Sequence, residues 1–536
     1  MKNIFLTTAI CVFTIILAAG FLSCRKTLDV APYNSFTDAT AFTSSARVEA
    51  AVNGVYDAAQ SGFYAGGAVR GYPFGAANVE QGDMRGEDML NDALFYQGTY
   101  ETAYNPSSAN QEFMFSTLYA LINRCNLVIK GVNDAVTKNI ITAAKGNQYI
   151  GECRFLRAMA HHELLINYAR PYSDGNGSKQ GIIYRDFPVA LDEELRAAKA
   201  LTRTNVAENY AKILEDLDYA EANLPAIVPD LTGAGIKTFR AAKAAVIALK
   251  MRVKLHKGDW AAVITEGNKL VPLNAPFVSP VGGWKLTTNP GDPFMAPWNS
   301  DESIFSVKNA ATDNGGVNGG MANMFGSPES NGRGLVKVSP VVFNLPQWKC
   351  DDKRRSLLIS YTATGKTNYF TTKYKDAATS TDACPQIRYA EVLLMLAEAE
   401  SRNIGNVSSR AIDLLNAVRN RSLASPAAQQ YILADFVTKN DLTKAILAER
   451  RIEFIAEGKR WADIHRLATD PLFSTNGIPA KIGTGSATTT MYSCGAGSSA
   501  YTTAIGAIPY ADFRFIWPVP LSEIQQNPNY TQNPGY

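Results

Sequence analysis

The run His161-His162-Glu163 is the first group of residues whose types suggest chemistry, because histidine and glutamate together can bind zinc. Two histidines that bind one ion from a helix usually lie four positions apart, on one face. Adjacent histidines point to different sides of a helix and cannot form that pair. The only other histidines are His256 and His465, and all four fall in helical patterns, so a histidine-based triad is poorly supplied. We therefore predict no metal site and no cofactor.

A second group is the charged run that contains Glu449, Arg450, Glu453 and Glu457. Paired carboxylates can act as general acid and base. Here the three glutamates fall on one helical row, with the arginine three residues before Glu453, which is the spacing of ion pairs that brace helices. Two further pairs at such spacing are Arg388 with Glu391 and Glu398 with Arg402. We predict a structural charge network here and no enzymatic activity.

Two long stretches, 61–109 and 274–340, lack helical periodicity and are rich in aromatic residues, glycine and asparagine. Loops this long inside a compact body are uncommon unless they bind something. The pairs Gly315-Gly316 and Gly319-Gly320 lack the lysine and the strand-to-helix context of a phosphate loop, so we expect a flexible loop there.

These irregular stretches hold the candidate ligand-binding residues. Sugar rings present apolar C–H faces that stack on flat side chains, while their hydroxyl groups need polar partners nearby. The candidate stacking residues are Tyr72, Phe74, Tyr96, Trp284 and Trp298. The candidate polar partners are Asp83, Asp88, Asn91, Asn323 and Arg333. For any one ring, burial in the core or contact with a partner protein is an equal alternative.

The elements that must position these loops are helices. Segments with helical periodicity are 42–60, 110–130, 145–168, 204–223, 238–256, 259–270, 386–402, 408–422 and 440–467. Between two of them, Gly258 can end one helix in the left-handed conformation while Asp259 caps the next. This is a helical-hairpin signature of the tetratricopeptide type, although no clean repeat of about 34 residues is visible.

Length and composition favour a globular protein of one large domain, or of two intimately packed ones. The chain has 536 residues, of which 46% are hydrophobic and 19% are charged. Its 52 basic and 49 acidic residues leave a net charge of +3, and no basic run could follow a phosphate backbone. Nucleic acid is therefore excluded as an expected partner.

The N-terminus predicts export. Lys2 precedes an uncharged apolar segment, 4–19, which is typical of a secretory signal, and Cys24 follows a small residue. We predict a lipoprotein signal peptide over 1–23 and a lipid anchor on Cys24. Phe21 departs from the leucine that such signals favour, so cleavage without acylation and an uncleaved helix remain alternatives. No later segment reaches the roughly 18 apolar residues of a spanning helix.

The remaining cysteines are Cys125, Cys153, Cys350, Cys384 and Cys494. Their number is odd and no CxxC spacing occurs, so thiol redox chemistry and structural zinc are weakly supported. The first two fall on helical patterns, which predicts small core residues. Pairing of Cys350 with Cys384 is compatible with an oxidising compartment, and the sequence does not decide it.

The segment 152–158 (ECRFLRA), followed by 167–172 (NYARPY), resembles the SusD/RagB family. Further matching segments recur in the same order along the chain: 28–33, 204–225, 241–260, 387–394, 397–399, 415–421, 449–454, 457–463, 517–520 and 527–536. They span nearly the whole chain after Cys24. The last segment, NPNYTQNPGY, is the most distinctive of them.

The resemblance implies a mainly α fold, in which a tetratricopeptide-like helical-hairpin scaffold carries long irregular loops and minor β structure. It implies one SusD-like domain over 24–536, with an N-terminal part of about 24–225 and a C-terminal part of about 240–536. Members of the family bind nutrients at the outer membrane, facing outward, and pass them to a SusC-like TonB-dependent barrel. Arg25 and Lys26 after Cys24 depart from the acidic residues of many surface-exposed relatives, so the membrane face stays open.

The cargo is not decided by the sequence. Most members bind oligosaccharides, and the RagB-like branch handles peptides, which is the main alternative here. A surface glycan hydrolase is a rival of another class, and it would need two carboxylates about 5 to 10 Å apart in a cleft. A scaffold that binds only other proteins is a third.

Overall fold

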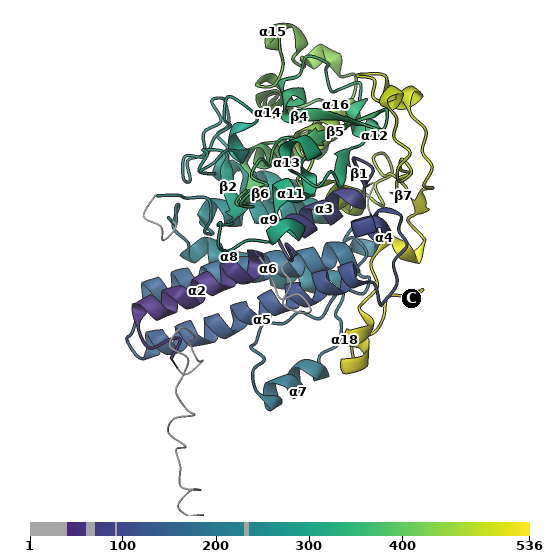
Figure 1. Cartoon of the computed structure of the whole chain (residues 1–536). Helices are drawn as coiled ribbons and strands as arrows, with labels where there is room; N and C mark the ends of the chain where they lie inside the picture. The colour runs from purple at the N-terminus through teal and green to yellow at the C-terminus, as the bar shows by residue number, and fades with distance from the viewer. Residues whose placement is uncertain (1–39, 61–69, 92–93, 230–234) are drawn as a thin grey trace, which may run out of the picture.

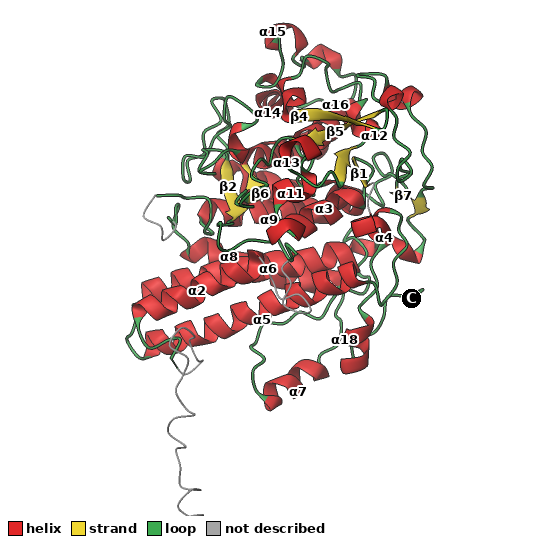
Figure 2. Ribbon diagram, in the orientation of Figure 1, coloured by secondary structure: helices red, strands yellow, loops and turns green. Residues whose placement is uncertain are grey.

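The computed structural model describes residues 40–60, 70–91, 94–229 and 235–536, and within them the chain is mainly helical (Figures 1 and 2). The predicted signal peptide and Cys24 lie outside the described residues. The longer helices are α2 (Ser45–Gln60), α5 (Ala109–Thr137), α6 (Ala143–Tyr168), α8 (Val206–Asn223), α9 (Lys243–Lys257), α10 (Trp260–Leu270), α13 (Tyr389–Asn403), α14 (Ser409–Asn420) and α16 (Lys439–Glu453). Shorter helices are α3 (Ala76–Met84), α4 (Gln97–Tyr100), α7 (Asp192–Ala200), α11 (Met321–Phe325), α12 (Pro340–Phe343), α15 (Pro426–Gln429), α17 (Arg460–Arg466) and α18 (Leu521–Gln526).

Helices pack on their neighbours in sequence, as the predicted hairpin scaffold requires. Contacts join α2 to α5, α5 to α6, α6 to α8, α8 to α9, α9 to α10, α10 to α13, and α13 to both α14 and α16. Their buried aliphatic side chains form one large core that continues along this series. In the described part of the chain, no helix combines the length and apolar character needed to cross a membrane.

The hairpin predicted at Gly258 is confirmed. This glycine closes α9 with φ 72° and ψ 19°, in the left-handed region. The Asp259 side chain accepts a hydrogen bond from the Ala262 amide at 3.2 Å, so α10 starts at Trp260. A left-handed glycine beside an N-cap aspartate reverses the chain within two residues, which sets α10 against α9.

The strands are short and form antiparallel pairs. They are β1 (Met89–Asn91) with β3 (Val336–Val338), β2 (Ser303–Val307) with β6 (Cys384–Arg388), β4 (Leu358–Ala363) with β5 (Lys366–Thr371), and β7 (Gly477–Ile478) with β8 (Ile508–Pro509). The β1–β3 pair joins the two irregular stretches of the sequence, with Met89 opposite Val338 and Asn91 opposite Val336.

Two predicted helices differ from the structure. The segment 386–402 begins as strand β6, and its helix starts only at Tyr389. The segment 440–467 is two helices, α16 and α17, because Ala456 and Gly458 between them take φ of 61° and 71°. The Lys373 ammonium donates to the freed carbonyl of Ile455 at 2.9 Å, which satisfies the backbone where the helix stops.

The C-terminal segment returns to the N-terminal half of the protein, as the yellow trace in Figure 1 shows. The buried Trp517 donates its backbone N–H to the Asn167 carbonyl at 2.9 Å. The Asn533 amide donates to the carbonyls of Tyr168 and Trp517, at 2.9 and 2.7 Å. This packing explains why the most distinctive motif lies at the end of the sequence. Its residues complete the packing around the C-terminal end of α6.

One disulfide differs from the pairing considered above. Cys350 is bonded to Cys494, and Cys384 is a free thiol buried in β6. The bridge fastens a C-terminal loop to the segment after α12, whereas the Cys384 thiol is fully buried and accepts a hydrogen bond from Gln386 Nε2 at 3.4 Å. Cys125 and Cys153 are buried free thiols on α5 and α6, which confirms their prediction as core residues.

Candidate functional site

The two irregular stretches meet in space, and their backbones touch through glycines. Gly71 has φ of 71°, and a side chain there would collide with the Ala76 amide. A Cβ added to Gly319 would lie 2.6 Å from the Gly71 backbone nitrogen. Only glycine permits this approach, so Gly319 is needed for close packing, while a flexible loop at Gly315-Gly316 and Gly319-Gly320 stays a prediction. Close packing of two backbones fixes the loops that the β1–β3 pair brings together.

A half-buried aromatic ring lies where these loops meet. The Phe95 ring has the guanidinium carbon of Arg70 5.4 Å from its centroid and that of Arg333 at 5.1 Å. The exposed Arg333 donates to the Asn318 side-chain oxygen at 2.6 Å, beside the exposed Val317. We call these five residues the Phe95 face. It combines a flat apolar ring with guanidinium and amide groups, which suits a hydroxylated ligand.

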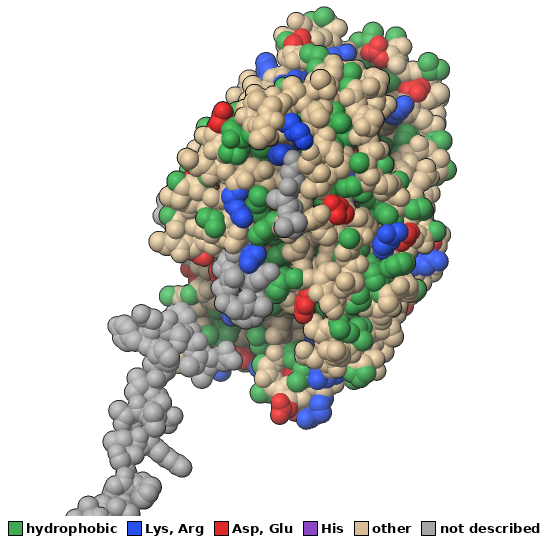
Figure 3. Space-filling model, turned by 45° about the vertical axis from the view of Figure 1, so that its right-hand side comes forward, with side chains coloured by type: hydrophobic (Ala, Val, Ile, Leu, Met, Phe, Trp, Pro, Cys, Tyr) green, Lys and Arg blue, Asp and Glu red, His purple; other side chains and the backbone are tan. Residues whose placement is uncertain are grey.

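The backbone around Arg333 is held firmly although its side chain reaches solvent. Its N–H donates to the Asn323 carbonyl at 2.8 Å, and strand β3 follows three residues later. Figure 3 shows a molecular face on which hydrophobic, basic and acidic side chains are interspersed without a broad patch of one kind. A ligand on such a surface is held by a few placed groups rather than by a large apolar area.

Two carboxyl groups of α3 are buried: Glu80 lies behind the Phe95 face, near Tyr96 and Arg333, whereas Asp83 lies near Gly458. Burial raises the pKa of Glu80 well above its usual range, and the Tyr96 hydroxyl and Arg333 charge oppose this less strongly. Burial likewise raises the pKa of Asp83, against a backbone hydrogen bond from Gly458. No described cation lies within ion-pair distance of either group, so both carboxyl groups favour the neutral form.

The predicted stacking residues are mostly closed to a ligand. Tyr72, Phe74, Tyr96 and Trp284 are each at most 2% exposed. Tyr72 packs on Phe113 with ring centroids 6.4 Å apart, and Trp284 lies under the Lys237 ammonium at 4.4 Å. Side chains with so little exposed surface offer no ring face to a sugar, and in this structure these four are core residues.

Trp298 is the exception among the predicted rings, because it is half-buried on a surface loop. Its φ of 57° is rare for a bulky residue, and the neighbouring Met295 is 48% exposed. Tyr374 contacts both Phe294 and Phe325, with ring centroids 5.9 and 5.8 Å apart, which ties this loop to the 323–333 region. Ligand contact at Trp298 stays a prediction.

Four of the five predicted polar partners are also buried. Asp88 pairs with Arg451, and Asn91 lies at the end of β1. Asn323 donates to the Ala377 carbonyl at 2.9 Å and accepts from Ser380. Asp83 is buried near Gly458, as described above. Their hydrogen bonds hold the loops together, whereas Arg333 alone of this set reaches the surface.

Sequence reasoning missed Phe95, Arg70 and Asn318. Phe95 precedes the predicted Tyr96, and the structure turns Tyr96 inward and leaves Phe95 half-buried at the surface. The segment shows neither the two-residue hydrophobic period of a strand nor the 3.6-residue period of a helix. The sequence therefore does not indicate which of two adjacent rings faces solvent. The one usable signal was the position of both rings in a long aromatic loop.

The histidines have structural surroundings. His161 stacks on Tyr184 with ring centroids 3.8 Å apart, and its Nε2 accepts from the Arg185 amide at 3.2 Å. His162 points the other way, toward His256, at 4.8 Å between centroids. Burial, together with Arg252 and His465, lowers the pKa of His162 to about 3. Among the described residues, no group of three potential ligands could hold a metal ion.

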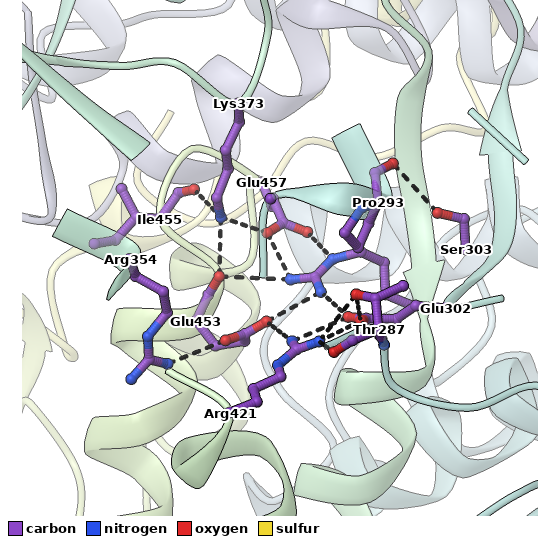
Figure 4. A network of polar contacts seen from close by, with 12 residues as sticks. Thr287, Pro293, Glu302, Ser303, Arg354, Lys373, Arg421, Glu453, Ile455 and Glu457 are labelled. Atoms are coloured by element: carbon purple, nitrogen blue, oxygen red, sulfur yellow. Dashed lines mark hydrogen bonds and ion pairs between the residues drawn. The ribbon is translucent and has the colours of Figure 1, made fainter. Parts of the chain in front are cut away.

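The predicted charge network exists, with partners different from those expected. We call it the buried charge cluster; it comprises Glu302, Asp352, Arg354, Lys373, Arg388, Arg419, Arg421, Glu449, Glu453 and Glu457. Figure 4 shows acidic and basic side chains from several segments pointing toward one another. Arg388 bonds Glu302, Glu453 and Glu457, not the expected Glu391.

Of the two ion pairs expected from helical spacing, one is present and the other is not. Glu398 and Arg402 pair at 3.0 Å, as predicted from their spacing. Glu391 instead pairs with Arg252 of α9 at 2.7 Å, because Arg388 precedes the helix and extends from strand β6. In the buried charge cluster, Glu453 accepts from Arg354, Arg388 and Arg421. The cluster therefore braces elements that are far apart in sequence.

The fold defines a class of proteins in which helical hairpins carry a surface built from long loops. A family model described as "SusD family" matches residues 358–536, and one described as "Starch-binding associating with outer membrane" matches 26–255. The chain belongs to the SusD/RagB family, as its motifs indicated. The division into parts of about 24–225 and 240–536 stays a prediction.

Relatives and solved structures agree with this assignment. SusD-like protein P38 of Formosa agariphila is 24% identical over 89% of this chain and 94% of its own. A SusD superfamily protein from Bacteroides fragilis is 25% identical, with a TM-score of 0.72 over 92% of this chain and all of the other. A structure titled as a putative sugar binding protein, from Bacteroides vulgatus, shares the fold at 21% identity and a TM-score of 0.68, covering 93% of this chain and all of the other.

Proposed function

We propose that this protein is a lipid-anchored outer-membrane binding protein that captures oligosaccharides and passes them to a SusC-like TonB-dependent barrel. The observation that carries the proposal is the Phe95 face: a half-buried ring flanked by two guanidinium groups, in a chain of the SusD/RagB family. A sugar ring stacked on Phe95 would place its hydroxyl groups within reach of Arg333 and Asn318.

Binding without bond cleavage fits the chemistry beneath this face. Hydrolysis of a glycosidic bond uses one protonated and one ionised carboxyl group beside the scissile bond. The carboxyl groups of α3 are Glu80, which lies behind the Phe95 face, and Asp83, and both are at most 2% exposed. A glycan on the surface therefore has no direct contact with either of them. The transport energy would come through the barrel.

Export is supported by the disulfide. Cys350 and Cys494 are 144 residues apart in sequence, and such a structural bridge persists in oxidising compartments. An exported chain with Cys24 after its apolar segment is a substrate for acylation. We propose that lipid on Cys24 holds the protein at the outer membrane, facing outward.

Ligand binding is tested with Phe95→Ala, measured by isothermal titration calorimetry against panels of oligosaccharides and peptides. We expect one class of oligosaccharide to bind, and the variant to weaken that binding by about tenfold or more, which corresponds to about 1.4 kcal/mol. Phe513→Ala is the matched control, because Phe513 is 38% exposed and has Arg514 5.9 Å from its ring. Binding of peptides alone would replace the saccharide with a RagB-like peptide cargo. Cleaved glycan products would replace binding with hydrolysis.

Anchoring and partnership have separate tests. Cys24→Ser should abolish incorporation of radiolabelled palmitate and release the protein from the outer-membrane fraction; labelling that persists would contradict the anchor. An adjacent gene for a TonB-dependent barrel, and its co-purification with this protein, would support the transporter role. Adjacent glycoside hydrolase or peptidase genes would identify the nutrient class.

A further inference from the structure

A second concave site lies between α2 and the chain that leaves β2. It is a cleft of about 590 Å³, which is within the size range of small-molecule sites. We call it the α2 cleft. Among its lining residues are Gly54, Tyr56 and Gln60 of α2, together with Phe239 and Asp313. None of the five residues of the Phe95 face lines it.

Gln60 places an unsatisfied acceptor in the α2 cleft. Its side chain is only 5% exposed, and its Nε2 donates to the Asn309 side chain at 3.1 Å and to the Asp313 carbonyl at 2.8 Å. These two acceptors fix the orientation of the amide. The other end, Oε1, is buried and has no hydrogen-bond partner in the described part of the chain. A buried acceptor without a donor is unfavourable, so the site suits a ligand that brings an O–H or N–H group.

Gly54 keeps the cleft open at a cost to the helix. It lies in the interior of α2, where a glycine makes the helix less stable than an alanine would. A Cβ added at this position would meet no atom within 4 Å. Neighbouring side chains therefore do not require glycine here. The missing side chain instead leaves room in the cleft wall.

The walls offer ring faces, and their cationic groups are mostly engaged. Tyr56 uses its hydroxyl in a hydrogen bond to Glu152 at 2.6 Å, so the ring is what it can offer a ligand. Arg240 is bonded to Glu152 at 2.8 Å through both Nε and Nη2. Phe239 lines the cleft with a second ring that is largely buried, at 6% exposure, and has the Lys308 ammonium 5.4 Å from its centroid. Two carboxylates, Asp57 and Asp313, line the exposed rim.

We infer that the α2 cleft is a second saccharide site, which takes one or two neutral sugar residues. Sugars supply hydroxyl donors for Gln60 and the carboxylates, and apolar C–H faces for the rings. The two rim carboxylates would disfavour acidic sugars such as uronic acids. The choice of saccharide rests on the proposed function, whereas the site itself rests on the geometry of the α2 cleft.

The test is calorimetry on the full mature chain with maltotriose, cellotriose, xylotriose and mannotriose as neutral probes and trigalacturonic acid as the acidic one. We expect a neutral probe to bind Phe95→Ala protein through the α2 cleft. Adding Gly54→Leu, which fills the cleft, should weaken this remaining binding by about tenfold or more. Gln60→Met, which keeps the shape and removes the acceptor, should weaken it less. Ala46→Leu, on an exposed position of the same helix, is the matched control.

The outcomes separate the two sites. Loss of all saccharide binding in Phe95→Ala, with no effect of Gly54→Leu in the wild-type background, would overturn the second site and leave the proposed function intact. Binding lost with Gly54→Leu but not with Phe95→Ala would support the α2 cleft and contradict the Phe95 face. Tighter binding of trigalacturonic acid than of every neutral probe would overturn the inferred ligand class. Gly54→Ala, which should keep both fold and binding, guards against loss of α2 itself.

Discussion

Two sets of buried carboxyl groups in this protein have pKa values that are shifted in opposite directions. In the buried charge cluster, burial acts to raise the pKa of Glu453, but three arginines hold it at about 2. On α3, burial raises the pKa of Glu80, behind the Phe95 face, and that of Asp83 well above the usual range. Burial is nearly complete in both regions, so the guanidinium groups within ion-pair distance decide the direction.

The comparison distinguishes the buried charge cluster, which braces the scaffold, from the Phe95 face, which can bind a ligand. The charge cluster joins the β2–β6 pair to α14 and α16 through contacts such as that between Arg421 and Glu453, at 2.7 Å. It holds the scaffold together while its charges compensate one another. Under the Phe95 face, a neutral Glu80 leaves the positive charge of Arg333 uncompensated from below. That charge is then available to a ligand.

The largest effect is expected from Arg388→Met. This change leaves Glu302, Glu453 and Glu457 buried with one cation fewer, and breaking such a buried pair costs about 3–5 kcal/mol. The free energy of unfolding, from urea denaturation followed by circular dichroism, should fall by that amount, or the protein should fail to fold. A decrease of less than about 1 kcal/mol in the free energy of unfolding would mean that the cluster does not brace the scaffold.

Acid should weaken the charge cluster next. The pKa of Glu453 is about 2 in the folded protein and about 4.3 in an unfolded chain. Its stabilising contribution is therefore complete above about pH 5 and is lost as the pH falls toward 2, on the order of 3 kcal/mol in all. Urea denaturation at pH 7, 5, 4 and 3 measures this loss. Glu453→Gln should make the dependence shallower, and an unfolding free energy that stays constant from pH 5 to 3 would contradict the assignment.

Glu80→Gln should have the opposite sign. Because the folded-state pKa of Glu80 is raised, its ionisation favours unfolding as the pH rises above the unfolded value near 4.3. An amide has no such ionisation, so the variant should be more stable than wild type by about 1–2 kcal/mol at pH 8 and by much less at pH 4. Thermal unfolding at both pH values checks the difference. A variant equally destabilised at both would show that the carboxyl group makes contacts that an amide cannot replace.

The smallest effect is expected from Arg410→Met. Arg410 pairs with Glu400 at 2.6 Å, and both side chains remain partly open to solvent, at 15% and 14%. Such pairs contribute about 0–1 kcal/mol. Measured beside Arg388→Met, this variant shows whether burial, rather than the loss of any ion pair, produces the large effect. Similar losses in both would remove the distinction.

The scaffold was predictable from the sequence because its signals are local. The Gly258-Asp259 turn follows from two residues, and the periodic helices follow from side chains four positions apart. The break at Ala456 was not visible, since it depends on Lys373 reaching a carbonyl from a distant segment. The same holds for Arg388, whose partners come from the residue before β2, from the end of α16 and from the turn after it.

The candidate site was predictable only as a region. The aromatic stretches do converge, but most of the chosen rings are core residues, and Phe95 was not chosen. Which of two adjacent rings turns outward depends on the β1–β3 pairing and on the contact between Gly71 and Gly319. Pairs of residues so far apart in the sequence leave no trace in a single sequence. Cys350 and Cys494 were beyond local reasoning for the same reason.

The contact of Trp517 with the end of α6 sets the order in which the core of the protein is completed. Synthesis proceeds from the N-terminus, so α5 and α6 exist long before the residues that complete their packing. The Asn167 carbonyl receives the Trp517 N–H, and the Tyr168 carbonyl receives the Asn533 side-chain donor, only when the last twenty residues arrive. A growing chain can therefore build its hairpins early but must keep that end of its core unfinished. Maturation of the first half waits for the final stretch of polypeptide.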